Sequence, residues 1–175
     1  IASAPHLDQS VWELASIISE AGARPVDDHG RVVAEVAGLE VARIVQSSDG
    51  LAVIEVGVGE ADRELHGLVH TAMDADTAVR RAVAMVSGER QRGSMHPLSR
   101  MARERWLRSL LLDDPSLIGA SRLRPVPPLI ARSTVLGNVP AAAVGTRADG
   151  TPIVVVCSTG IDLDLVPEAT DYRRR

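Results

Sequence analysis

The segment TPIVVVCSTGIDLDLV, residues 151–166, holds residue types that could carry chemistry. An apolar run leads into Cys157, and Asp162 and Asp164 follow at alternate positions. Small polar residues after a strand are where α/β folds often place ligands, and paired carboxylates can bind a divalent metal. We therefore take Asp162 and Asp164 as candidate catalytic residues. The alternative, which we favour over a metal site, is that one aspartate caps a following helix and the other faces water.

Cys157 is the single cysteine of the chain, which excludes an intrachain disulfide and a zinc site with several cysteines. A phosphatase-type loop needs an arginine six residues after its cysteine, and that position is Leu163. We therefore expect Cys157 to be a small buried hydrophobic residue of a strand.

Two further patterns fall short of a site. His66 and His70 have the spacing of helical metal ligands, but Gly67 disfavours a helix and replaces the glutamate of HExxH. On a strand the two rings would lie about 13 Å apart, too far for one ion. The glycines of residues 57–60 lack the third glycine of GxGxxG, because residue 62 is aspartate, so they are expected in a turn or bulge. We predict no metal and no cofactor.

The charge pattern limits the possible functions. All 19 basic residues are arginine, which excludes a Schiff-base lysine and a phosphate-loop lysine. The net charge of −4 disfavours general binding to nucleic acid. The main basic concentration supplies a candidate binding patch, formed by Arg100, Arg103, Arg105 and Arg108. The competing interpretation, a solvated helix face without a ligand, is the one that we favour, since Trp106 lies on the apolar side.

The first half of the chain predicts an α+β domain over residues 1–88. Helical spacing of apolar residues favours a helix over 8–21, and alternation favours a hairpin over 31–46 and a strand over 51–58. A fourth strand is expected near 64–70. A helix over 74–87, capped by Asp74, completes a helix–antiparallel meander–helix unit whose sheet has one face in water.

The second half predicts a linker at 89–96 and a second α/β unit over 97–175, truncated at its C-terminus. One helix should run from Pro97 to about residue 112 with Leu98, Met101, Ala102, Trp106 and Leu110 on its apolar face. Residues 121–138 hold three prolines and predict an extended crossing. Strands at 139–146 and 151–158 form a β-hairpin about residues 148–150, and Pro167 opens a last helix. The abrupt ends suggest a piece of a longer protein.

Three segments, EVGVGEADRE at 55–64, HPLSRMARERWLR at 96–108 and VPAAAVGTRADGTPIVVVCSTGIDLDLVP at 139–167, resemble uncharacterised conserved proteins of actinobacteria. That family has no assigned activity, so the resemblance implies no site residue. The order of helix, strands and helix in the second half is similar to restriction-endonuclease-like cores, which hold a metal with Asp and Glu-x-Lys. The strand PIVVVCS has neither acid nor lysine, so this similarity implies an inactive relative.

These observations favour a non-enzymatic, cytoplasmic interaction module whose partner is another protein or a second copy in a homodimer. Two alternatives stay open: a degenerate nuclease-like or nucleic-acid-associated protein using Asp162 and Asp164 with the arginines of the helix at 98–112, and a secretion-chaperone-like domain with an exposed apolar groove. The absence of an apolar run of about 18 residues predicts no membrane span.

Overall fold

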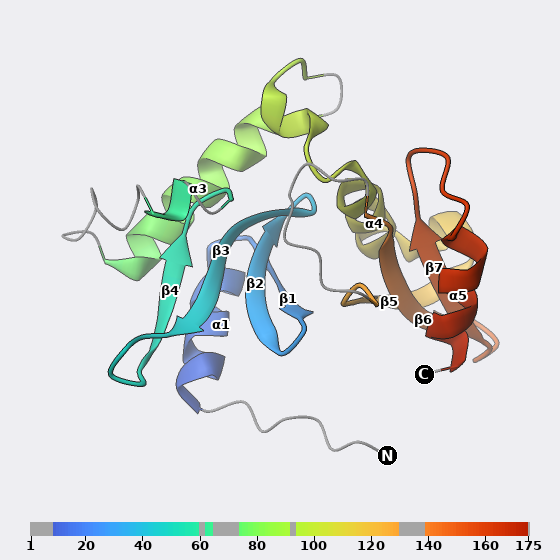
Figure 1. The fold of residues 1–175 in the computed structure, drawn as a ribbon, viewed down its shortest axis with the longest axis horizontal. Helices are drawn as coiled ribbons and strands as arrows, with labels where there is room; N and C mark the ends of the chain where they lie inside the picture. The colour runs from blue at the N-terminus through green and yellow to red at the C-terminus, as the bar shows by residue number, and fades with distance from the viewer. Residues whose placement is uncertain (1–8, 60–61, 65–73, 92–93, 130–138, 175) are drawn as a thin grey trace. The chain divides into compact units, whose positions relative to one another are not determined.

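The computed structural model describes residues 9–59, 62–64, 74–91, 94–129 and 139–174 (Figure 1). The chain divides into two compact units, residues 1–36 with 40–91 and residues 37–39 with 92–175. Both units combine helices with antiparallel strands, so the predicted α+β class is confirmed.

The first unit contains a four-stranded sheet, and in the sequence one helix precedes its strands and another follows them. Its elements are α1 (Gln9–Glu20), β1 (Arg24–Asp28), β2 (Arg31–Val36), β3 (Leu39–Gln46), β4 (Ala52–Val56) and α3 (Ala75–Glu89). The strands lie in the order β1-β2-β3-β4. The predicted meander is thus present, but β1 was not anticipated, because RPVDD offers a single strong β-former, Val26, which pairs with Val33.

Both helices of the first unit pack against the sheet, with contacts from α1 to β1 and β4 and from α3 to β2 and β4. Ile18, Val33, Val79 and Val86 are among the buried residues. The predicted cap of α3 is confirmed: the Asp74 carboxylate accepts a hydrogen bond from the Thr77 backbone N–H at 2.9 Å. This bond lowers the pKa of Asp74.

Two expectations for the first unit are the sheet face in water and the fourth strand near residues 64–70. The strand β2 buries four consecutive residues, Val33 to Val36, whereas a strand with one face in water would alternate. The burial of β2 therefore does not show the alternation expected of a sheet with one face in water. Residues 65–70 of the expected fourth strand and both His66 and His70 lie outside the described residues, and Glu64 is helical.

The second unit consists of a three-stranded antiparallel sheet with helices. Its elements are the short 3₁₀ helices η1 (Pro97–Arg100) and η2 (Pro115–Ile118), α4 (Arg103–Asp113), β5 (Ala120–Val126), β6 (Ala141–Arg147), β7 (Pro152–Cys157) and α5 (Leu165–Arg174). The predicted continuous helix from Pro97 is wrong. Met101 is extended and Ala102 adopts a left-handed conformation, with φ of 44°, so residues before and after this break do not share one helical face.

The sheet of the second unit has the order β5-β6-β7. The hairpin of β6 and β7 agrees with the sequence. The strand β5 overlaps the start of residues 121–138, which were expected to be an extended crossing and not a strand of the sheet. Its proline, Pro125, is tolerated because β5 is an outer strand of this sheet, where a missing backbone N–H breaks no ladder. The ladder between β5 and β6 shifts register between Ala120 and Arg122, which marks a bulge.

The two faces of this sheet are covered by different helices (Figure 1). The helix α4 contacts all three strands, on the face that carries Ala141, Ala143 and Cys157. On the other face, Ala142 and Val126 form a core with Tyr172 of α5, and the main strand contacts of α5 are with β7. Among the described residues, α5 therefore covers one side of this face, and no other helix covers the side near β5.

Gly145 permits the bulge of β5, because a Cβ atom at this position would lie 1.8 Å from the Arg122 carbonyl oxygen. We expect Gly145→Ala to destabilise the protein by about 1–3 kcal/mol, since backbone must move to relieve the clash. Gly88→Ala is the control, because Gly88 lies in α3 and an added Cβ atom there would meet no heavy atom within 4 Å. This change should raise the free energy of unfolding by about 0.5 kcal/mol, since alanine has the higher helix propensity. Urea unfolding followed by circular dichroism measures both, and equal effects would contradict the bulge argument.

Candidate functional site

The open part of the sheet face in the second unit forms a groove of about 1520 Å³. Residues of β5, β6 and β7 make its floor, and the helix α5 makes one wall. We call it the arginine groove, because four arginines line it: Arg122, Arg124, Arg147 and Arg173. The described residues that line it include no carboxylate.

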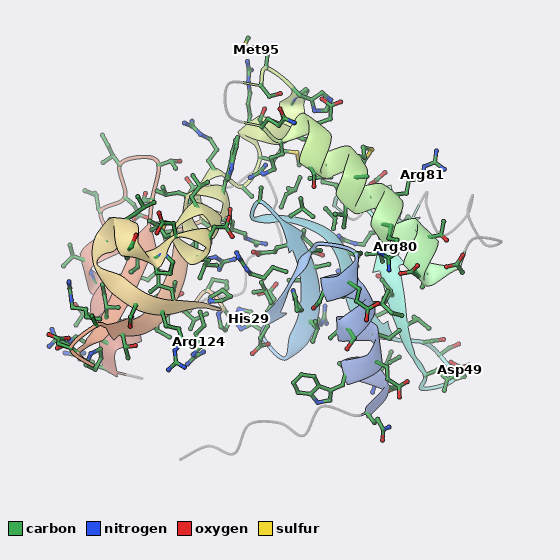
Figure 2. The ribbon with its side chains drawn as sticks, turned by 180° about the vertical axis from the view of Figure 1, so that it is seen from behind. His29, Asp49, Arg80, Arg81, Met95 and Arg124 are labelled. Atoms are coloured by element: carbon green, nitrogen blue, oxygen red, sulfur yellow. The ribbon has the colours of Figure 1, made fainter. Side chains whose placement is uncertain are left out.

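Strand alternation places two of these arginines on the open face. Arg124 pairs with Val144 and Arg122 with Thr146, so their side chains leave β5 on the same face as Val126. Arg173 comes from the last turn of α5, and Arg147 ends β6. Figure 2 labels Arg124, whose side chain extends outward from its strand.

The charges of the groove are poorly compensated. Within the described part of the chain, no ion pair joins Arg122, Arg124 or Arg173 to a carboxylate. Arg147 interacts with Asp149. Hydrogen bonds from Thr151 lower the pKa of this aspartate, and the charge of Arg147 lowers it further. Guanidinium groups held together without counter-charges repel one another, which favours the arrival of an anion.

The floor of the groove is apolar. It includes Val144, Val154 and Val156 from the sheet and Ala169 from α5. The Tyr172 hydroxyl donates a hydrogen bond to the Pro127 carbonyl oxygen at 3.0 Å, which ties the end of α5 to the chain just after β5. Tyr172 is buried, so its ring does not offer an open face on which a base could stack.

This combination is suited to binding an anion that also carries an apolar part. Arginine forms paired hydrogen bonds with carboxylate or phosphate groups, and the valines provide surface for an apolar group. Among the described residues that line the groove there is no carboxylate, imidazole or thiol. The described lining does hold the hydroxyls of Thr146, Thr151 and Thr170, but no imidazole or carboxylate of that lining lies beside them to act as a general base.

The candidate aspartates lie in the turn before α5. The Asp162 carboxylate accepts a hydrogen bond from the Asp164 backbone N–H at 2.9 Å, and the Asp164 carbonyl oxygen accepts one from the Glu168 backbone N–H. Asp164 is exposed. The Asp162 carboxylate thus closes the turn just before α5, which begins at Leu165, and does not cap a backbone N–H of the helix itself. No group of three His, Cys, Asp or Glu side chains suited to a metal occurs among the described residues.

The predicted basic patch is not one surface. Arg100 and Arg103 are exposed and Arg105 is half-buried, whereas Arg108 is only 3% exposed. The solvated-face interpretation is therefore wrong for Arg108, and the expected apolar face of this helix is wrong as well. The break at Ala102 changes the phase of α4.

The buried residues of α4 are Glu104, Arg108 and Ser109. Glu104 accepts a hydrogen bond from the hydroxyl of Thr159, which follows β7. The charge of Arg108 acts on Cys157, the last residue of that strand. Polar side chains can lie under a helix where such partners meet them, and small residues of β6, Ala141 and Ala143, leave room for these long side chains.

Two arginines of the first unit, Arg63 and Arg90, interact with glutamates of its sheet. Arg63 and Glu40 form an ion pair at 3.0 Å, next to Gly57, whose φ is 145°. Residues 57–59 form a bend after β4, and Gly57 and Gly59 both have a positive φ, which agrees with the expected role of these glycines, whereas residue 60 lies outside the described residues. Burial lowers the pKa of Arg90 to about 10, while the charge of Glu35 acts in the opposite direction.

The arginine groove was missed from the sequence. The alternation of Arg122, Arg124 and Val126 was a possible signal of a strand with these residues on one face. The nearby prolines, Pro125, Pro127 and Pro128, obscured it. The contribution of Arg173 depends on where α5 packs, which periodicity alone does not specify.

Comparison with known proteins gives no further assignment: the chain matches no family model, no curated protein and no solved structure. The resemblance to actinobacterial proteins therefore stays a prediction. One finding bears on the membrane expectation, since none of the helices in the described residues has the length and apolarity to cross a bilayer.

Cys157 is buried, as expected, with 3% of its surface exposed. Burial raises the pKa of the thiol, and the weaker effect of Arg108 opposes it. Because the thiolate is the reactive form, we expect native protein at pH 7 to react with a thiol reagent at least about tenfold more slowly than unfolded protein. Because the chain has a single cysteine, the rate measured with a coloured thiol reagent reports on Cys157 alone. Equal rates in buffer and in guanidinium chloride would contradict the burial.

Proposed function

We propose that this chain is a non-enzymatic interaction module of the cytoplasm, and that the arginine groove binds a segment of a protein partner with acidic and apolar side chains. One observation carries the proposal: in the described lining, four arginines and no carboxylate surround an apolar floor. This concentration is notable in a chain with a net charge of −4. An acidic segment would neutralise the arginines, while its apolar side chains would cover the valines.

The size of the groove supports a macromolecular ligand. Its volume of about 1520 Å³ exceeds the roughly 300–1,000 Å³ typical of small-molecule pockets. Its lining also comes from three strands and a helix, so contacts are distributed along a surface. A peptide segment uses such a surface better than a compact metabolite does.

Nucleic acid fits the described surface less well. Phosphates would satisfy the arginines, but single-stranded binding also uses aromatic side chains on which bases stack. The one aromatic residue in the described lining is Tyr172, which is buried. An apolar floor of valines contributes little to a phosphate backbone, so the acidic protein segment is favoured.

The test uses a fluorescent peptide of alternating leucine and aspartate, with anisotropy as the measurement. Arg124→Glu should weaken its binding at least about tenfold, because the reversed charge repels the peptide. Arg81→Glu is the matched control, since Arg81 is an exposed arginine of α3 in the first unit (Figure 2). Binding by the unchanged protein should weaken as salt rises.

Three companion probes separate the possible ligands. A peptide of alternating glycine and aspartate tests the apolar contribution, an alternating leucine and lysine peptide tests the charge, and an oligothymidylate tests nucleic acid. All three should bind more weakly than the leucine–aspartate peptide. Equal binding by the Arg124→Glu and Arg81→Glu variants, or stronger binding of oligothymidylate, would overturn the proposal.

A further inference from the structure

The loop between β7 and α5 exposes large apolar side chains. Ile161 is 99% exposed, Leu163 is 90% exposed, and Val166 in the first turn of α5 is 74% exposed. Asp162 and Asp164 alternate with the first two of them. The loop leaves the end of β7 and turns back into α5 (Figure 1). We call residues 161–164 the acidic loop.

The acidic loop has the chemistry that complements the arginine groove. Its two carboxylates match a surface whose described lining has four arginines and no acid, and its aliphatic side chains match an apolar floor of valines. The loop does not occupy the groove of its own chain, because Ile161 and Leu163 are almost completely exposed. Resting on the proposed function, we propose that the partner of the arginine groove is the acidic loop of a second copy of this chain.

The positions of the loop and the groove favour a reciprocal dimer. Leu165 and Val166, which directly follow the acidic loop, line the groove. Donor and acceptor surfaces are therefore neighbours on the same unit. In a two-fold dimer each copy can then insert its loop into the groove of the other copy, so that both loops are buried together.

The charge contacts of this dimer can be tested by reversal. Asp164 is exposed, and Arg124 projects from the open face of β5. In the homodimer, Asp164→Arg would bring arginine to arginine at both contacts, and Arg124→Asp would bring acid to acid. Each single variant should raise the dimer dissociation constant at least about tenfold relative to the unchanged protein, as measured by sedimentation velocity over a range of concentrations.

An equimolar mixture of the two variants should recover the dimer. The arginine at position 164 of one copy then meets the aspartate at position 124 of the other, and the second contact keeps the original pair. A folding defect in either variant would not be repaired by mixing. Recovery therefore identifies a contact between copies, while failure of the mixture to associate would overturn the proposal.

The contribution of the apolar side chains of the acidic loop, Ile161 and Leu163, can be tested with a matched control. The double variant Ile161→Ser and Leu163→Ser should weaken dimerisation at least about tenfold. Leu117→Ser should not, because Leu117 is an exposed leucine, at 64%, that lies outside both the loop and the groove. Equal effects of the two changes would contradict insertion of the loop.

The outcome also separates this inference from the proposed function. If the unchanged protein is monomeric at every concentration but binds the leucine–aspartate peptide through Arg124, the self-docking inference is wrong and the groove takes a different acidic partner. If neither the peptide nor a second copy binds, both proposals are wrong.

Discussion

The unequal covering of one small sheet is the constraint on which the functional surface depends. In the second unit, α4 packs over all three strands, whereas the main strand contacts of α5 on the opposite face are with β7. A three-stranded sheet buries its faces only where another element covers them. Among the described residues, the side near β5 is therefore left without a covering helix, and the bond from Tyr172 to Pro127 ties the end of α5 to the chain after β5.

Backbone geometry then decides which charges border that surface. The bulge at the start of β5 requires a close approach of the Arg122 carbonyl oxygen to residue 145, which only glycine permits. Alternation carries Arg122 and Arg124 to the open face, and the last turn of α5 adds Arg173. The same alternation turns Cys157 to the opposite face, under α4, where burial keeps its thiol protonated by raising its pKa. Alternation in β5 thus sets which charges border the groove, and alternation in β7 places the cysteine under α4.

The charged residues of α4 show why composition is a poor guide to location. Arg108 was assigned to a solvated helix face, in keeping with the rule that charged residues are seldom fully buried. In the structure, Glu104 meets the Thr159 hydroxyl, and the charge of Arg108 acts on the Cys157 thiol. The break at residues 101 and 102 separates Leu98 from the helix that carries Trp106 and Leu110. The residues that α4 buries are Glu104, Arg108 and Ser109, so the face turned inward is not the one expected from apolar spacing.

The sequence by itself determined the local elements with strong signals. Alternation and turn residues specified β2, β3, β4, β6 and β7, and the Asp74 cap and apolar spacing specified α3, because these signals arise between near neighbours in the chain. Only the tertiary structure revealed β1 and β5, whose weak or proline-containing segments are stabilised by pairing with neighbouring strands. It also decided the arginine groove, since register and the placement of α5 bring together residues 122, 124, 147 and 173, and no local pattern encodes that meeting.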